Sequence, residues 1–236
     1  MANVLTGYAI LEHTKNHIHI ELSVPHQVVS SAVLNGGMVQ ANHIVNMKVP
    51  KDSPCPELPE LTLSRYCAVS GWSGTAVGMM TAASMDSFRM TKKSEQGIEI
   101  AVLVTSGLSN PRRAGDYAEH RQMASHYKDV GTINIIVITS ASLTGSALIE
   151  ALLITTEAKS AALQEAGIMS PVSNKLATGT GTDSVAVVSG PGPGDVKYCG
   201  KHVLFGELLG SSVIAAVSSS IQWTIENKTH KIRQSR

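Results

Sequence analysis

The sequence predicts an α/β or α+β fold, a sandwich in which long helices cover a mixed β-sheet. Two observations support this prediction. Apolar runs of strand length fill the first half of the chain, and two long helical segments alternate with strands in the second half. A chain of 236 residues is of a size that one large domain can occupy, so residues 1–236 are expected to form a single domain.

The N-terminal quarter is expected to be a run of strands. Apolar residues alternate with polar ones on both sides of Lys15 and Asn16, which predicts a β-hairpin over residues 8–22. Two further strands are expected near 27–34 and 43–49. The three prolines of segment 51–59 remove backbone donors and fix φ, so this segment is expected to be a connector.

Later in the chain, strands and helices follow one another. Thr144 is a suitable N-cap and Gly167 a suitable stop for a largely buried helix over 144–166. A second amphipathic helix is expected from Gly206 to about Asn227. Four apolar clusters are expected to be strands, at 76–83, 98–104, 133–138 and 184–189.

Composition excludes several classes of protein. The net charge is +1 and aromatic residues make up 4% of the chain, so neither a basic stripe nor stacking platforms for nucleic acid are expected. No stretch reaches the ~18 consecutive apolar residues of a membrane span. Three cysteines without a C-x-x-C pair favour the reducing cytoplasm over a disulfide framework. The oligomeric state is left open, a homo-oligomer included.

The most informative segment is the glycine-threonine loop, Ala177 to Ser184. Glycines supply tight turns, while Thr180, Thr182 and Asp183 gather polar groups between two apolar elements, as in a binding or catalytic site. The alternative is a capped loop whose side chains only satisfy backbone donors. Since an exposed loop carries little packing energy, a change at Asp183 is expected to leave folding intact.

Other polar residues are candidates for the same site. Asn110 and Asp116 follow an apolar strand in a loop that also carries two arginines, and the alternative there is an arginine-aspartate pair that only staples the loop. Asn134 begins a buried strand, and Ser31 and Asn35 follow the end of another. A buried Asn134 would alternatively satisfy only a backbone group.

Charged and metal-ligating residues raise two further questions. Glu157 lies four residues after Leu153 and eight after Ile149, so it is expected on a helical stripe that faces the core, either as a catalytic carboxylate or in a buried ion pair. The histidines at 13, 17 and 19 could share one face of the hairpin as a metal cluster. Exposed strand histidines are the expected alternative, and no metal site is assigned.

Taken together, these segments resemble the adenosylcobinamide amidohydrolases. The resemblance runs from about Ser30 to about Val217 in the order of the family and departs from its pattern at Gly145 and Val203. It rests on five groups of residues: Gly107 to Asn110 with Ala114 to Asp116, Gly131 to Asn134, Thr156 to Lys159 with Ala161 to Leu163, Ala177 to Asp183, and Gly200 to His202 with Gly206-Glu207.

The resemblance implies hydrolysis of the amide that joins the aminopropanol arm of adenosylcobinamide to the corrin ring, giving adenosylcobyric acid and 1-amino-2-propanol. The cobalt corrinoid would be the substrate, and no cofactor is expected. Two alternatives are a corrinoid-binding protein without catalysis and a hydrolase that cleaves the same amide in complete cobamides.

The chemistry of amide hydrolysis suggests roles for the candidate residues. Asp183 or Glu157 would act as general base on water or on a threonine hydroxyl, and His202 would be the proton donor. Asn134 and the glycine-rich loop would hold the oxyanion. The residues expected to contact the substrate are Ser31, Asn35, Asn110, Asp116, Asn134, Thr180, Thr182 and Glu207.

Overall fold

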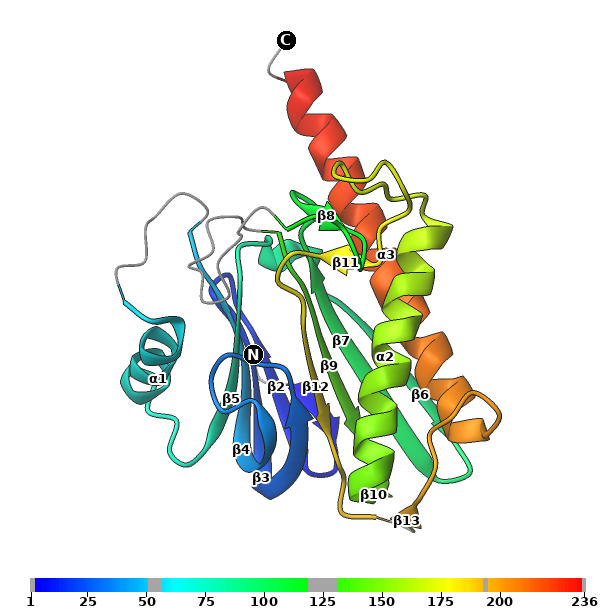
Figure 1. Ribbon diagram of the computed structural model, residues 1–236. Helices are drawn as coiled ribbons and strands as arrows, with labels where there is room; N and C mark the ends of the chain where they lie inside the picture. The colour runs from blue at the N-terminus through cyan, green and yellow to red at the C-terminus, as the bar shows by residue number, and fades with distance from the viewer. Residues whose placement is uncertain (1–2, 51–56, 119–130, 193–194, 235–236) are drawn as a thin grey trace.

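The computed structural model describes residues 3–50, 57–118, 131–192 and 195–234. A nine-stranded mixed sheet has helices on both sides, which confirms the predicted fold class (Figure 1). Its strand order is β1-β2-β3-β12-β9-β7-β6, and β4 pairs with both β3 and β5. The strands are β1 (Asn3–Thr6), β2 (Ala9–His13), β3 (His17–Ser30), β4 (Gly37–Lys48), β5 (Ala76–Thr81), β6 (Arg89–Glu95), β7 (Ile98–Ser106), β9 (Ile133–Thr139) and β12 (Ser184–Val188).

The sheet folds over itself at the long strand β3. The β3–β4 register is irregular between Glu21 and His26; before this point β3 also pairs with β2, whereas its last residues pair with β12. A core of apolar side chains from both halves of the sheet lies between them, including Ile20, Ile44 and Ile136. The protein therefore has two β layers, with helices outside each.

The outer helix on one side, α1 (Pro59–Val69), corrects the prediction of a connector over 51–59. Proline is tolerated in the first turn of a helix because the amide that it lacks has no intrahelical partner there. Pro59 therefore begins α1 instead of preventing a helix. Leu63 and Cys67 pack beneath it on Val45 and Met47 of the sheet. Residues 51–56 of the expected connector lie outside the described residues.

Two helices cover the other side, α2 (Gly145–Glu165) and α3 (Leu204–Gln234) (Figure 1). Thr144 accepts a hydrogen bond from the Ala147 amide at 3.3 Å, and Gly167 has φ +64°, so both predicted ends of α2 are confirmed. The expected buried stripe is wrong, because Ile149 and Leu153 are half-exposed. The buried side of α2 instead combines small residues such as Ala151 with larger ones such as Leu148 and Ile154.

Among the described residues, one helix has the length and composition of a membrane span, although the sequence holds no run of ~18 consecutive apolar residues. An 18-residue window within Leu204–Asn227 of α3 has a mean hydropathy of 1.5, although serines interrupt the apolar run. Half of this stretch is buried inside the protein, where Leu209, Val213 and Val217 join the core beneath α2. The packing is that of a core helix.

The remaining predicted strands correspond to observed ones. The hairpin over 8–22 is formed by β2 and β3, and the strands near 27–34 and 43–49 are parts of β3 and β4. Strands β5, β7, β9 and β12 match the four later predictions. Strand β6 was missed because this edge strand alternates half-buried and exposed residues, most of them polar. Short elements complete the fold: η1 (Met85–Ser87), β8 (Pro111–Arg112), β10 (Ser142–Leu143), β11 (Gly179–Thr180) and β13 (Asp195–Val196).

Candidate functional site

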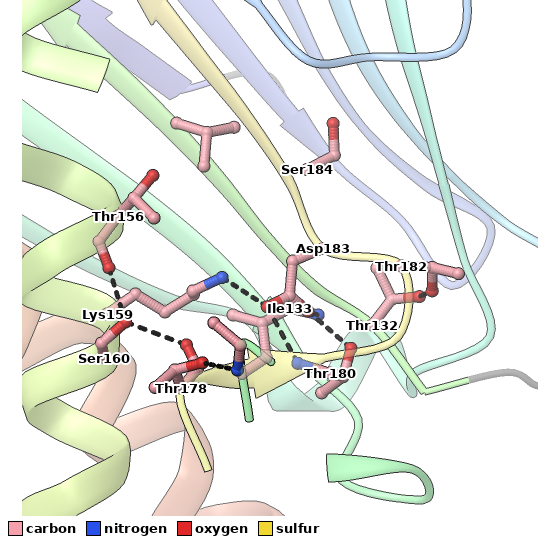
Figure 2. A network of polar contacts seen from close by, with 12 residues as sticks. Thr132, Ile133, Thr156, Lys159, Ser160, Thr178, Thr180, Thr182, Asp183 and Ser184 are labelled. Atoms are coloured by element: carbon pink, nitrogen blue, oxygen red, sulfur yellow. Dashed lines mark hydrogen bonds and ion pairs between the residues drawn. The ribbon is translucent and has the colours of Figure 1, made fainter. Parts of the chain in front are cut away.

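Asp183 is the centre of a polar network at the start of β12 (Figure 2). Its Oδ1 accepts hydrogen bonds from the Ile133 amide at 2.9 Å and from Thr180 Oγ1 at 2.5 Å. Its Oδ2 accepts from the Thr180 amide at 3.0 Å and from Lys159 Nζ at 2.5 Å. Four donors thus occupy the four lone-pair sites of the carboxylate. Among these donors, the Thr180 hydroxyl is a candidate nucleophile.

The threonine hydroxyls converge on the carbonyl oxygen of Gly131. Thr180 Oγ1 lies 2.6 Å and Thr182 Oγ1 lies 3.0 Å from this oxygen, and Thr132 Oγ1 lies 2.7 Å from Thr182 Oγ1. Thr180 has one hydroxyl proton and two acceptors, Gly131 O and Asp183 Oδ1. Its proton is therefore already aimed at a carboxylate or a carbonyl.

Lys159 was not singled out as a candidate site residue. It lies on α2, and its side chain is 8% exposed where it pairs with Asp183, itself 9% exposed. Gly179 makes this contact possible, because a side-chain carbon there would lie 2.4 Å from Asp183 Oδ2. Helical spacing puts Lys159 on the same face of α2 as Ala151 and Thr155, and the structure shows that this face is buried.

The two asparagines of the candidate site are both buried but point to different places. Asn110 lies against Gly131 and Gly181. It is therefore next to the threonine network, the group formed by Thr132, Thr180, Thr182, Asp183 and the Gly131 carbonyl. Asn134 Nδ2 instead points between the two β layers, where it donates to Asn46 Oδ1 at 2.8 Å and to Met80 O at 2.9 Å. Among the described residues, neither asparagine's Oδ1 has a hydrogen-bond partner.

Three other residues that were expected to contact the substrate form hydrogen bonds with backbone groups of the protein. Ser31 Oγ accepts from the Val185 amide at 3.1 Å, next to Ser184, and Asn35 Nδ2 donates to Ala76 O at 2.9 Å. Asp116 accepts from Ser170 Oγ at 2.5 Å and from the Arg113 amide at 2.7 Å. These hydrogen bonds lower the pKa of Asp116, and the one from Ser170 has the largest effect.

The structure does not bring the other candidates to Asp183. Glu157 is exposed and pairs with Lys201 in solvent, so its expected place on a core-facing stripe is wrong. His202 and Glu207 are also exposed, near the start of α3. No hydrogen bond or ion pair among the described residues joins any of these three side chains to the threonine network.

The hairpin histidines do not share one face. His13 packs on Phe88 towards the inside, whereas His17 and His19 face the side that α1 covers. Both are buried instead of exposed: His19 Nε2 lies 3.0 Å from His43 Nδ1 beneath the stacked ring of Trp72, and His17 Nδ1 lies 2.7 Å from the Tyr66 hydroxyl. Within the described ranges, no group of three metal-ligating residues could hold a metal ion.

This cluster predicts a loss of stability in acid. Burial, and after it His43, lowers the pKa of His19 from 6.5 to about 4. The unfolded chain therefore takes up a proton below pH 6.5 that the folded protein refuses until about pH 4, so stability falls as the pH falls through this window. We expect a loss of about 2–3 kcal/mol between pH 7 and pH 4.5 in urea unfolding. A His19→Gln variant should lose this part of the slope, and an unchanged slope would contradict the assignment.

The two cysteines among the described residues are unsuited to nucleophilic attack. Burial raises the pKa of Cys199 to about 12, and it also raises the pKa of Cys67. Both thiols are free and buried. Cys55 lies outside the described residues. Hydroxyl and carboxylate groups therefore offer the better chemistry at the threonine network.

Comparisons with known proteins agree with the resemblance. A profile of the family described as adenosylcobinamide amidohydrolase matches residues 1–229. Protein MJ1613 of Methanocaldococcus jannaschii, named as uncharacterized, is 35% identical over 158 residues, which cover 61% of this chain and 61% of that protein. The adenosylcobinamide amidohydrolase of Methanosarcina mazei is 30% identical over 201 residues, 81% of this chain and 88% of that one. The solved PH0078 protein of Pyrococcus horikoshii OT3 aligns with 95% of this chain and 80% of its own, with a TM-score of 0.45 and 13% identity.

Proposed function

Because the chain belongs to the adenosylcobinamide amidohydrolase family and is therefore a hydrolase of amides, we propose that it acts on adenosylcobinamide itself. The bond cleaved is the amide between the aminopropanol arm and the corrin ring. The products are adenosylcobyric acid and 1-amino-2-propanol, which places the enzyme in cobamide salvage. The match over residues 1–229 is the observation that carries this proposal.

The threonine network is the proposed catalytic centre, with Thr180 as nucleophile and Asp183 as its general base. An activated hydroxyl needs a base within hydrogen-bond reach and a third group that orients the base. The 2.5 Å contact between Thr180 Oγ1 and Asp183 Oδ1 supports the first requirement, and Lys159 on Oδ2 supports the second. Since the other sites of Asp183 are occupied, a threonine hydroxyl is favoured over water as the group that Asp183 deprotonates.

The reaction would proceed in two halves. Thr180 Oγ1 attacks the amide carbon while its proton passes to Asp183, and collapse of the tetrahedral intermediate returns that proton to the departing 1-amino-2-propanol. The corrin is then joined to Thr180 as an ester. Water attacks the ester and gives one proton to Asp183, which passes it to Thr180 as adenosylcobyric acid leaves. The sum is one amide plus one water, giving one acid and one amine.

In this scheme no cofactor is needed, and cobalt arrives within the substrate. The exposed His202, earlier suggested as proton donor, and Glu157, earlier suggested as base, are not required for any step. Glu207 likewise lies outside the network. We propose a cytoplasmic location, which the free thiols of Cys67 and Cys199 support.

Product analysis tests the function directly. Purified protein with an excess of adenosylcobinamide is expected to release many equivalents of 1-amino-2-propanol per protein without added metal, and mass spectrometry should detect the new corrin carboxyl group. A shift in the corrinoid spectrum without product would overturn catalysis in favour of a binding protein. A parallel reaction with a complete cobamide shows whether the nucleotide loop is accepted, and hydrolysis of that substrate alone would overturn the assignment of adenosylcobinamide.

A further inference from the structure

The side-chain amide of Asn110 is held between two glycines. A side-chain carbon at Gly131 would lie 2.1 Å from Asn110 Oδ1, and one at Gly181 would lie 2.8 Å from Asn110 Nδ2. Both distances are far below van der Waals contact, so any other residue at either position would displace the amide. Asn110 is 7% exposed. Its amide can keep this orientation because neither Gly131 nor Gly181 carries a side chain.

The two ends of this amide have different surroundings. Oδ1 is buried against Gly131 without a hydrogen-bond partner among the described residues. Nδ2 lies at Gly181, which is exposed. The amide nitrogen is thus the end of the group that lies on the open side of the loop, and it can donate to an incoming acceptor.

The position of Asn110 relative to Thr180 is fixed by strand pairing. Strands β8 and β11 are antiparallel, with Thr180 opposite Pro111 and Gly179 opposite Arg112. Continuing this register places Asn110 opposite Gly181, immediately after the proposed nucleophile. A donor here is one residue from the threonine whose hydroxyl contacts Asp183.

We infer that Gly181 is a positioning residue, whose lack of a side chain keeps Asn110 Nδ2 aimed at a carbonyl oxygen of a corrin side-chain amide. This inference rests on the proposed function, since it takes the corrinoid as ligand. The corrin edge carries several amides, and their carbonyl oxygens accept the hydrogen bond that a carboxamide nitrogen donates. Asn110 then contributes to substrate binding, and Gly181 acts only through Asn110.

A double-mutant cycle tests this coupling. Asn110→Ala is expected to raise KM for adenosylcobinamide about three- to tenfold, the loss of about one hydrogen bond, with kcat little changed. Gly181→Ala should raise KM by a similar factor although it leaves Asn110 in place. Because the new methyl group meets only the Asn110 side chain, the double variant should resemble Asn110→Ala alone.

Gly7→Ala is the matched control, since a side-chain carbon there has no neighbour within 4 Å. The inference is overturned if Gly181→Ala keeps the wild-type KM, if the two effects multiply in the double variant, or if kcat falls while KM stays constant. Dissociation constants from the corrinoid absorption spectrum give the same cycle without turnover. A wild-type protein that binds but does not hydrolyse would defeat the proposed reaction, and the binding cycle would still decide the role of Gly181.

Discussion

Replacing Asp183 by asparagine is expected to lower the free energy of unfolding by about 3–5 kcal/mol. The substitution leaves the Lys159 ammonium buried without a counter-charge, and it exchanges one acceptor oxygen for a donor that faces the Ile133 or Thr180 amide. Equilibrium unfolding in urea measures the change. The sequence expectation that folding would survive rested on an exposed loop, and that premise is wrong because the Asp183 side chain is 9% exposed.

Glu157→Gln is the matched control, since it also removes a carboxylate that pairs with a lysine on or beside α2. The Glu157–Lys201 pair is exposed on both sides, so its loss should change stability by less than about 1 kcal/mol. Asp183→Asn combined with Lys159→Met should be more stable than Asp183→Asn alone, because no unpaired charge is left buried. Equal effects of Asp183→Asn and Glu157→Gln would contradict the distinction between the buried and the exposed pair.

The sequence predicted the fold better than it predicted the site, for a physical reason. The strands and the caps of α2 follow from local patterns. Thr144 caps the start of that helix and Gly167 follows its end, as expected. The direction in which a nearly all-apolar helix faces does not follow from composition. Ile149 and Leu153 are exposed, whereas Leu148 and Ile154 of the same helix are buried, so residues of the same kind lie on both faces.

The uncertain direction of α2 explains why Glu157 was chosen as a catalytic candidate and Lys159 was not. Setting the buried stripe of α2 at Leu153 placed Glu157 inside and left Lys159 unnoticed, whereas the structure has Lys159 buried and Glu157 in solvent. The loop around Asp183 could be found from its glycines and threonines. Two of its partners, Lys159 and the Ile133 amide, could not, because the first depends on the direction that α2 faces and the second reaches Asp183 only through strand pairing.

Replacing Thr180 by valine is expected to reduce kcat at least about a thousandfold, within the range caused by losing a nucleophile or its base. Valine keeps the β-branched shape in β11 and replaces the hydroxyl by a methyl group. Stability should fall by about 1–3 kcal/mol, because Asp183 Oδ1 loses a donor, while Thr182 Oγ1 still donates to Gly131 O at 3.0 Å. Initial rates of 1-amino-2-propanol release and a urea unfolding curve for the same preparation measure the two quantities.

Two further variants in the same loop separate nucleophile from scaffold. Thr182→Val also removes a hydroxyl that donates to Gly131 O, but Asp183 accepts no hydrogen bond from it, so activity should stay within about tenfold of wild type. Thr180→Ser keeps the reacting oxygen and should restore most of the activity that Thr180→Val loses. Rapidly quenched wild-type protein should carry the corrinoid as an ester on the peptide that contains Thr180. If Thr180→Val turns over normally while Thr182→Val does not, the nucleophile is not Thr180, and Asp183 serves only to hold the loop.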